Sequence, residues 1–307
     1  MILIISLNLA IDKVLYVDEL KIFSENRVKL ISSLPGGKGV NVARCLKSLG
    51  KVSYVSGFIG GYNGKYIEDG LKKEGIYYIL QEIEFENRVC NIIVDKFKNI
   101  TEVYEIGPEI NEQAFICLLE KIKFRKESFQ YIIISGSIPR GIKDQDFLKF
   151  IDIFKDRKIF LDIHGDFLLK ILENYEIFFL KINEKEFINT FKVEKENIFE
   201  SLKNIYKKYK IFLFVITLGD KGAIFAYKDK IYKIFSKMNV LKINPVGAGD
   251  AFMGGFVYGI DEGMNIFDAL KYGISASISN VTLYEGGKVN IEIFDEILKN
   301  IIIEEVY

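Results

Sequence analysis

The segment Asn244–Asp250 combines the residue types from which phosphoryl-transfer sites are built. A strand-like run, Asn239–Ile243, precedes it, and a run of small residues typical of a helix follows it. Gly247 and Gly249 at such a junction allow several backbone N–H groups to point at one spot, where the helix dipole favours negative charge. A carboxylate beside an anion pocket is unfavourable unless it receives a proton during the reaction. Asp250 is therefore a candidate general base for transfer to a hydroxyl, with an ordinary helix cap as an equal alternative when the turn is taken alone.

A second glycine-rich segment, Leu34–Arg44, surrounds a lysine and leads into a helical pattern. Its glycines allow backbone N–H groups and the Lys38 ammonium to approach a small polar ligand closely. The segment is not a Walker A loop, because no Ser or Thr follows Lys38, and Val42 stands in place of the third glycine of a dinucleotide fingerprint. Gly60–Tyr66 misses the Walker pattern in a similar way. A tight turn between strand and helix is the better interpretation of either segment alone.

Small and polar residues follow three further apolar runs. Ser135–Gly141 would leave room for a ligand across the end of its strand. Asn183 and Glu186 are spaced to share a helix face, where their oxygens could hold a hydrated Mg²⁺. An Asn cap with a Glu three residues later is an equally sound interpretation of this pair. The glycines of Thr217–Gly222 could bracket a purine or its ribose.

Short apolar runs alternate with helical patterns over most of the chain, which predicts an α/β fold. Continuous apolar runs are typical of parallel strands buried on both faces, so we expect a doubly wound, mostly parallel sheet flanked by helices. Ligands are expected beyond the carboxyl ends of its strands. The clearest strands are predicted at Ile2–Leu7, Val52–Ser56, Tyr131–Ser135, Ile159–Asp162, Ile177–Leu180 and Phe212–Thr217. Helices are predicted at Lys38–Leu49, Tyr66–Glu74, Glu112–Lys123 and Phe199–Tyr209.

Two regions break this alternation with strand pairs that have no helix between them. Val14–Val17 pairs with Val28–Ser32, and Arg88–Val94 pairs with Thr101–Ile106 through a hairpin tip at Phe97–Asn99. Together they predict a small antiparallel β lid, formed by about residues 12–34 and 86–107, on a single domain of residues 1–307. Such a lid is also a candidate surface for a homodimer.

The composition favours a globular protein whose partner is a small molecule. Of 307 residues, 49% are hydrophobic, which is sufficient for a large core. The 42 basic and 42 acidic residues leave no net charge to attract nucleic acid. The single histidine, His164, argues against a histidine metal cluster or a Ser-His-Asp hydrolase, and Cys45, Cys90 and Cys117 are expected to be reduced thiols. The sequence has neither a signal-peptide pattern nor an uncharged apolar run of about 18 residues, so we expect a cytoplasmic protein without a membrane partner.

Six motifs occur in the order and spacing of the PfkB (ribokinase-like) carbohydrate kinases, and the resemblance runs from Met1 to about Glu285. The six are Leu7–Asp12, Pro35–Asn41, Ser135–Gly141, Asn183 with Glu186, Thr217–Gly222 and Asn244–Asp250. Each motif is weak alone, whereas six in register are specific. The resemblance implies a ribokinase-like fold, ATP with Mg²⁺, and a sugar as the phosphoryl acceptor. It also lowers the weight of the cap interpretation of Asp250.

The resemblance implies roles for individual residues. Asp250 matches the catalytic base, and Gly247, Ala248 and Gly249 match the anion hole. The matches on the sugar side are Asp12, Gly37, Lys38, Asn41, Arg88, Cys90, Ser137 and Arg27, of which Arg88 would grip the phosphate already on the sugar. The matches on the nucleotide side are Lys181, Asn183, Thr217, Gly219, Gly222 and Asn280. Asn183 and Glu186 match the motif associated with Mg²⁺ bound through water.

Within this family the motifs are most similar to kinases of phosphorylated ketohexoses, which implies ATP-dependent phosphorylation of a ketohexose phosphate to the bisphosphate. Cys90, Arg140 and Pro245 are more similar to tagatose-6-phosphate kinases, with 1-phosphofructokinase as the alternative. Asn87 replaces a usual Thr, which could alter the position of the phosphate. Two interpretations belong to other classes. The intact loop before Asp250 argues against a non-catalytic sugar- or nucleotide-binding regulator, and the missing third glycine argues against a nicotinamide-dependent oxidoreductase.

Overall fold

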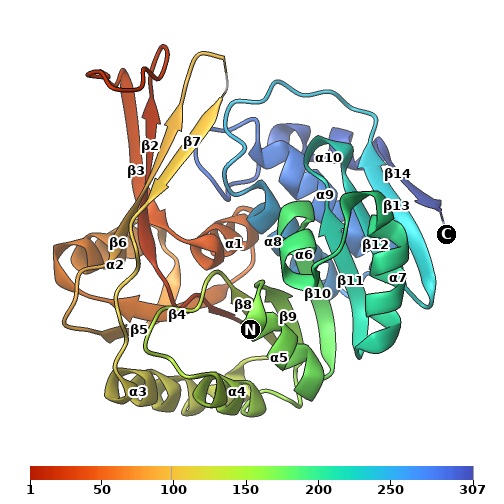
Figure 1. Ribbon diagram of the computed structural model, residues 1–307, viewed down its shortest axis with the longest axis horizontal. Coiled ribbons are helices and arrows are strands. Elements are labelled where there is room, and N and C mark those ends of the chain that lie inside the picture. Colours follow the sequence, from red (N-terminus) through yellow and green to blue (C-terminus); the bar gives the residue numbers. More distant parts are fainter. Residues whose placement is uncertain (98, 307) are drawn as a thin grey trace.

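The computed structural model describes residues 1–97 and 99–306, and within them one large sheet contains ten strands (Figure 1). The order across the sheet is β14-β13-β12-β11-β10-β9-β8-β1-β4-β5. The strands from β11 to β5 run parallel, and β12, β13 and β14 are antiparallel. Their bounds are β1 Ile2–Ile5, β4 Ser53–Ile59, β5 Tyr77–Glu82, β8 Tyr131–Ser135, β9 Lys158–Asp162, β10 Ile177–Asn183, β11 Ile211–Thr217, β12 Ala223–Tyr227, β13 Lys230–Ser236 and β14 Ile301–Glu305. The predicted mostly parallel sheet is confirmed.

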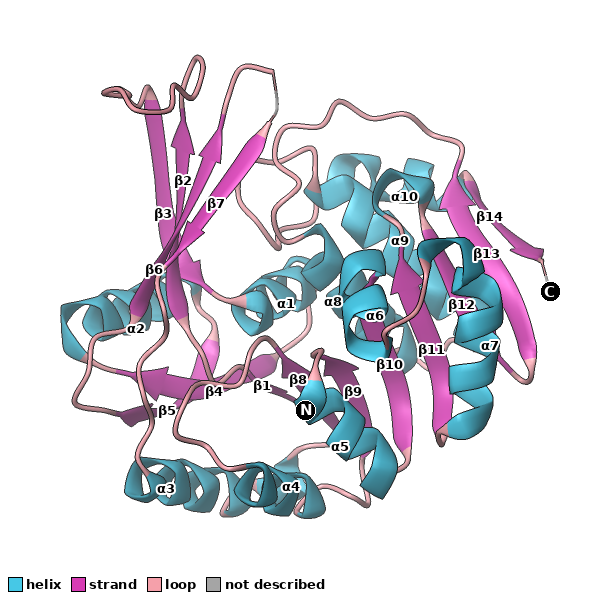
Figure 2. Ribbon diagram, in the orientation of Figure 1, coloured by secondary structure: helices cyan, strands magenta, loops and turns pink. Residues whose placement is uncertain are grey.

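Helices cover both faces of this sheet (Figure 2). The first layer consists of α3 (Glu112–Lys123), α4 (Asp144–Asp152), α5 (Asp166–Asn174), α6 (Glu184–Phe191) and α7 (Ile198–Lys208). The second consists of α1 (Lys38–Ser48), α2 (Gly61–Glu74), α8 (Ala248–Asp261), α9 (Ile266–Asn280) and α10 (Ile291–Lys299). None of the helices in the described part of the chain combines the length and the apolar character that crossing a membrane requires.

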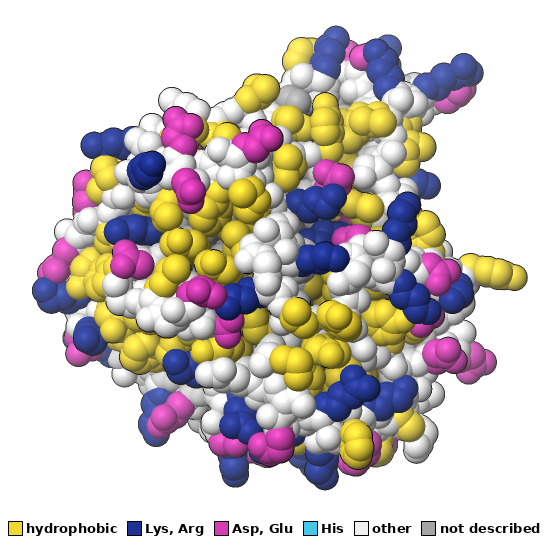
Figure 3. Space-filling view, turned by 180° about the vertical axis from the view of Figure 1, so that it is seen from behind, with side chains coloured by type: hydrophobic (Ala, Val, Ile, Leu, Met, Phe, Trp, Pro, Cys, Tyr) yellow, Lys and Arg dark blue, Asp and Glu magenta, His cyan; other side chains and the backbone are white. Residues whose placement is uncertain are grey.

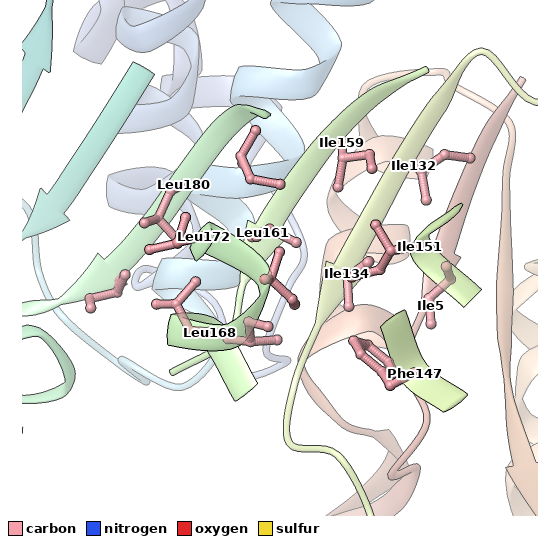
Figure 4. Packing of buried hydrophobic residues seen from close by; sticks show 14 of the residues in the cluster. Ile5, Ile132, Ile134, Phe147, Ile151, Ile159, Leu161, Leu168, Leu172 and Leu180 are labelled. Carbon is pink, nitrogen blue, oxygen red and sulfur yellow. The ribbon is translucent and has the colours of Figure 1, made fainter. Parts of the chain in front are cut away.

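The two helical layers give the sheet two separate apolar cores, which explains the continuous apolar runs. Successive side chains of a strand point to opposite faces. In β1, Leu3 and Ile5 therefore pack with the first layer, whereas Ile2 and Ile4 pack with the second. Figure 4 shows the first core, in which Ile, Leu and Phe side chains from strands and from helices meet between the layers. Burial on both faces holds the carboxyl ends of the parallel strands in fixed positions along one edge.

The lid is a second sheet that stands off the large one, with strands in the order β3-β2-β6-β7 (Figure 1). Its strands are β2 (Ala10–Tyr16), β3 (Leu30–Gly36), β6 (Arg88–Val94) and β7 (Ile100–Tyr104). Each predicted strand pair is antiparallel, and the two pairs are joined by parallel pairing of β2 with β6. Lys98, in the predicted hairpin tip, lies outside the described residues. The lid starts directly from the carboxyl end of β1, so it borders the edge where ligands are expected.

The predicted strand at Asn239–Ile243 is wrong, because this segment is an irregular loop. The strand of this region is β13, which ends at Ser236. After it, the N–H groups of Ile243 and Asn244 donate to the carbonyl oxygen of Val281, just beyond α9, at 2.7 and 3.1 Å. The loop is thus anchored by the end of a helix, and the apolar Leu241 that resembled a strand residue is 80% exposed.

Candidate active site

Asp250 lies in the first turn of α8 and is 7% exposed. The residue at the N-cap is Gly247, whose left-handed backbone has φ 80° and provides no side-chain cap. The cap interpretation of Asp250 is therefore wrong. Its carboxylate Oδ2 instead accepts a hydrogen bond of 2.9 Å from Nδ2 of Asn41 on α1. Burial and the nearby charge of Asp162 together raise the pKa of Asp250 to about 6, against the lowering effect of Lys181, Lys38 and the Asn41 hydrogen bond.

The turn before α8 is held from behind by the segment that follows α9. A Cβ at Gly247 would lie 2.6 Å from the backbone nitrogen of Gly287, so this position requires glycine for space as well as for its φ. Asn244 is buried, and its Nδ2 donates to the carbonyl oxygen of Tyr284 at 2.7 Å. Its Oδ1 accepts from the N–H of Val246 at 3.0 Å. Within the turn, the N–H of Ala248 donates to the carbonyl oxygen of Pro245 at 3.3 Å, and the N–H of Ala251 donates to that of Gly247 at 2.7 Å. These contacts fix the backbone at the N-terminus of α8, the kind of position at which anions bind.

A cluster of two lysines and two carboxylates lies beside Asp250. Asp162, at the carboxyl end of β9, is 1% exposed and accepts from Nζ of Lys38 at 3.2 Å and from Nζ of Lys181 at 2.7 Å. Although burial acts in the opposite direction, these two lysines lower the pKa of Asp162. Lys38 also donates to Oε1 of Glu186 at 2.9 Å, and Lys181 donates to the carbonyl oxygen of Gly249 at 3.1 Å. The cluster therefore joins the Lys38 segment, the α6 segment and the α8 turn.

Asp162 was not among the site residues predicted from the sequence. It ends a strand that is apolar and buried on both faces, and a carboxylate in that position was the available signal. In the sheet it pairs with Ser135, which begins another of the predicted motifs. The importance of Asp162 depends on contacts with Lys38 and Lys181, 124 and 19 residues away in sequence. Strand-end polarity alone does not reveal such contacts.

Asn183 and Glu186 form a capping box at the start of α6. The N–H of Glu186 donates to Oδ1 of Asn183 at 2.8 Å, and the N–H of Asn183 donates to Oε2 of Glu186 at 2.9 Å. The capping interpretation is confirmed, and it leaves Oε1 of Glu186 facing Lys38. Among the described residues, no group of three or more acidic, histidine or cysteine side chains forms a metal cage. Asp162 and Glu186 both contact the ammonium group of Lys38, so the two carboxylates face one position beside a cation. Such a pair fits a hydrated Mg²⁺ that is carried by the phosphates of a nucleotide.

Asp12, Gly37 and Asn41, three of the predicted sugar-side residues, lie where the lid meets the large sheet. Asp12 of β2 accepts a bond of 3.4 Å from the N–H of Gly37, and burial raises the pKa of its carboxyl although Arg44 and this N–H lower it. Asp12 and Asn41 line a narrow cavity of about 10 Å³ between the lid and the segment Asn244–Val246.

Arg88 and Ser137 are brought together by Asn8, which the sequence analysis did not single out. Nη2 of Arg88 donates to the carbonyl oxygen of Asn8 at 3.3 Å, and Nδ2 of Asn8 donates to Oγ of Ser137 at 2.9 Å. Nε of Arg88 and Oδ1 of Asn8 are buried and have no hydrogen-bond partner within the described part of the chain. Unpaired buried polar atoms are unfavourable, so a phosphate at this place would satisfy the guanidinium. Asn87, which stands where a Thr is usual, is buried. Its Nδ2 donates to the carbonyl oxygen of Phe58 in β4 at 3.0 Å, so it anchors the segment before β6 to that strand.

A cavity of about 330 Å³ lies on the other side of the α8 turn. Thr217, Gly219 and Gly222, three of the residues predicted for the nucleotide side, line it together. Ala248 and Gly249 line it as well, so the candidate anion hole opens into this cavity. The size is suitable for part of a nucleotide. The N-terminus of α8 thus carries Asp250, and its first residues, Ala248 and Gly249, line this cavity.

Two of the predicted site residues, Asn280 and Arg27, do not join this arrangement. Asn280 is buried, but Nδ2 donates to the carbonyl oxygens of Glu285 and Lys288 at 3.3 and 2.9 Å, and it holds that loop rather than lining the 330 Å³ cavity. Arg27 lies in the exposed loop between β2 and β3 at the far end of the lid, where it pairs with Glu25 at 3.0 Å (Figure 1). Cys90 pairs with Asp12 in the lid sheet, and burial raises the pKa of its thiol to about 11.

The fold is ribokinase-like, and a buried carboxylate lies at the N-terminus of α8, hydrogen-bonded to Asn41, which lines the narrow cavity under the lid. The chain matches the pfkB family of carbohydrate kinases over residues 1–289 and belongs to that family. It is therefore a sugar kinase, and membership implies ATP as the phosphoryl donor.

Solved structures support the fold over the full chain. The chain is 26% identical to a candidate phosphofructokinase from Staphylococcus aureus, with a TM-score of 0.78 and coverage of 100% of this chain and 99% of that one. It is 24% identical to a candidate 1-phosphofructokinase from Thermotoga maritima, with a TM-score of 0.90 and coverage of 100% and 99%. It is 21% identical to the tetrameric inhibited form of phosphofructokinase-2 from Escherichia coli, with a TM-score of 0.86 and coverage of 97% and 98%.

Proposed function

We propose that this protein transfers the γ-phosphoryl group of ATP to a hydroxyl of a ketohexose monophosphate and forms the bisphosphate and ADP. The observation that carries the proposal is the position of Asp250. It lies buried at the N-terminus of α8, hydrogen-bonded to Asn41, which lines the narrow cleft under the lid. The adjacent Gly249 lines the cavity on the nucleotide side. A base in this position can contact the acceptor hydroxyl while the helix N-terminus faces the transferred group.

The chemical step follows from this arrangement. The sugar oxygen attacks the γ-phosphorus, the bond from that phosphorus to the β–γ bridging oxygen breaks, and ADP leaves with the bond electrons. The hydroxyl proton passes to Asp250, whose pKa of about 6 allows it to be ionised at neutral pH and still to accept a proton. The N–H groups at the start of α8 stabilise the charge on the transferred group.

Mg²⁺ would supply charge neutralisation for the β- and γ-phosphates when the nucleotide is bound. Glu186 and Asp162 are the residues of this chain that would hold its water shell, with Asn183 fixing Glu186 through the capping box. Lys181 contacts both Asp162 and the carbonyl oxygen of Gly249, so it links this region to the anion hole. Lys38, at the centre of the cluster, places a positive charge beside the path of the phosphoryl group.

The acceptor is proposed to carry a phosphate because Nε of Arg88 is buried and has no hydrogen-bond partner among the described residues, and because Asn8 links this arginine to Ser137. Tagatose 6-phosphate is proposed as the preferred acceptor, because Cys90 resembles the corresponding residue of tagatose-6-phosphate kinases. Cys90 lies beside Asp12 in the lid. The other two sequence indicators carry less weight, because Pro245 lines the nucleotide cavity and Arg140 is exposed. Fructose 1-phosphate is the second candidate, favoured by the likeness to the candidate 1-phosphofructokinase from Thermotoga maritima.

The test compares kcat/KM for tagatose 6-phosphate, fructose 1-phosphate and fructose 6-phosphate under identical conditions, with free tagatose and fructose as controls. Formation of ADP and of the bisphosphate are measured together. We expect the highest value for tagatose 6-phosphate and at least about tenfold lower values for the free sugars. A higher value for fructose 1-phosphate selects the second candidate. Equal values with and without the sugar phosphate group contradict the role of Arg88, and ADP release without any phosphorylated sugar contradicts the proposed function.

The lid is proposed to form a homodimer through its outer face. Every residue of β7 is exposed, including Val103 at 55%, and Ile31 of β3 is 54% exposed. Figure 3 shows hydrophobic side chains gathered on the lid, in the upper right of that view, below charged side chains at its tip. An exposed apolar sheet of this kind is typical of an interface between subunits.

A further inference from the structure

Arg44 is a buried residue of α1 without a role among the predicted site residues. Its side chain is 3% exposed. Nε and Nη2 donate to the two carboxylate oxygens of Glu74, the last residue of α2, at 2.6 and 2.7 Å. Two parallel bonds of this kind fix the plane of a guanidinium group. The remaining nitrogen, Nη1, donates to Oδ1 of Asn41, one helical turn earlier, at 2.9 Å.

The bond from Arg44 determines which way round the Asn41 amide is held. An arginine side chain can only donate hydrogen bonds, and an ionised carboxylate can only accept them. Asn41 therefore links Arg44 to Asp250 in a single orientation, with its oxygen toward the guanidinium and its NH₂ group toward the carboxylate. The reverse orientation would place its oxygen against the Asp250 carboxylate and its NH₂ group against the guanidinium.

We infer that Arg44 is a positioning residue for phosphoryl transfer, which holds the Asn41 amide so that Oδ2 of Asp250 is occupied and Oδ1 receives the hydroxyl proton. This inference rests on the proposed role of Asp250 as the base. Arg44 also donates to the carbonyl oxygen of Pro35 in β3, so it fixes α1 against both α2 and the lid. A purely structural role in joining these elements is the alternative that an experiment must separate.

A double-mutant cycle separates the two roles. Arg44→Ala, Asn41→Ala and the double variant are purified, and kcat and KM are measured for the same sugar phosphate. We expect Arg44→Ala to lower kcat by about 10- to 100-fold, and to have almost no further effect when Asn41 is already Ala. Multiplicative losses in the double variant would overturn the inference.

Lys51→Ala is the matched control, because it removes contacts to Asp261 and Glu262 that join α8 to the neighbouring loop, away from the site. It should leave kcat unchanged.

The pH dependence of kcat gives a readout that a structural role would not change. Loss of the oriented Asn41 donor raises the pKa of Asp250, so the acid limb of kcat should move to higher pH in Arg44→Ala. The charged and titratable groups that face Asp250 are Asp162 on β9, Lys181 on β10, and Lys38 and the Cys45 thiol on α1, and all are retained in this variant. Arg44 also lowers the pKa of Asp12 directly, an effect on sugar binding that is read separately in KM. An unmoved limb would contradict the inference.

Chemical rescue with free guanidinium tests the inference if Arg44→Ala is too unstable for the kinetic measurements. A cavity of about 710 Å³ borders Arg44 and Glu74, through which free guanidinium can reach the vacated place. Millimolar guanidinium should restore kcat in Arg44→Ala and should have no effect on Arg44→Leu, whose side chain fills the space. Glu74→Gln, which keeps the volume, should show a smaller loss of the same kind. Rescue of thermal stability without rescue of kcat would overturn the inference.

The activity of Asp250→Asn separates a failure of this inference from a failure of the proposed function. Near-normal turnover of Asp250→Asn refutes the role of Asp250 as the base. An inactive Asp250→Asn together with additive effects in the double-mutant cycle refutes only the positioning role of Arg44.

Discussion

Asp162 and Asp250 are two buried carboxylates that face the same two lysines, and their pKa values are shifted in opposite directions. Asp162 binds Lys38 and Lys181 directly, at 3.2 and 2.7 Å, and its pKa is lowered. Asp250 is acted on by these lysines through space, and burial and the charge of Asp162 raise its pKa to about 6. Neighbouring carboxylates with separated pKa values can serve different tasks. Asp162 stays ionised to hold the lysines, and Asp250 is free to exchange a proton.

Replacement of Asp250 by Asn should lower turnover strongly while ligand binding remains. The amide is similar in size and can still accept from Asn41, but it cannot take a proton. We expect kcat to fall by roughly 100- to 10,000-fold with little change in the affinity for ADP. Steady-state kinetics and calorimetric titration with ADP measure the two quantities. Retention of near-normal kcat would show that another group is the base.

The activity of the native protein should depend on the ionisation of Asp250. Only the carboxylate form accepts the hydroxyl proton, so kcat/KM should rise through a pH near 6 and level off above it. Asp162→Asn removes the like charge that raises this pKa, so its acid limb should lie at lower pH. Both profiles come from initial rates in buffers of constant ionic strength. A limb near pH 4 in the native protein would contradict the raised pKa.

The raised pKa of Asp250 also affects the free energy of unfolding, and the direction of the pKa shift determines the sign of this effect. A carboxyl whose folded-state pKa is raised contributes stability below its unfolded-state pKa, and this contribution is lost as the pH rises through the folded-state value. Asp250→Asn should therefore unfold with a higher free energy than the native chain at pH 7.5, by roughly 3 kcal/mol at most. The difference should shrink toward pH 4. Urea unfolding at several pH values measures it, and a variant less stable than the native protein at pH 7.5 would refute the argument.

Gly247→Ala should damage the anion hole more than a positive φ alone explains. Gly247 has φ 80° and a Cβ there would lie 2.6 Å from the Gly287 nitrogen, whereas Gly50 has φ 82° and open space around it. Gly50→Ala is the matched control and should cost about 1 kcal/mol of stability with kcat unchanged. Gly247→Ala should cost more stability and lower kcat, because the turn must shift. Equal effects of the two substitutions on kcat would show that crowding at Gly247 is unimportant.

The lid dimer should depend on apolar contact across β7 and β3. Val103→Lys combined with Ile31→Lys places charges on the exposed lid face and should convert the dimer to a monomer, as measured by light scattering on a sizing column. Phe124→Lys is the control, because Phe124 is 91% exposed at the end of α3, outside the lid. A native protein that is monomeric at micromolar concentration, or a dimer that survives the double substitution, would rule out this interface.

Local signals in the sequence were sufficient for the elements and for much of the site. Apolar runs identified the buried parallel strands, because burial on both faces demands an apolar side chain at every position. The helix Glu112–Lys123 and the strand Tyr131–Ser135 occur with the predicted bounds. The glycines before Asp250 correctly indicated a helix N-terminus, since a left-handed turn needs glycine. The run Asn239–Ile243 was misread, because it is a loop in which Leu241 is exposed and Val240 and Ile243 are only partly buried.

The sequence by itself thus determined the fold class, the family and the turn that carries Asp250. Only the tertiary structure placed Asn41 against Asp250, 209 residues away, and Asp162 between Lys38 and Lys181. It also turned Asn280 toward the loop at Lys288 and left Arg27 at the tip of the lid. The physical reason is that propensity and periodicity act over a few residues, whereas these contacts depend on strand order and on which helix packs beside which strand end.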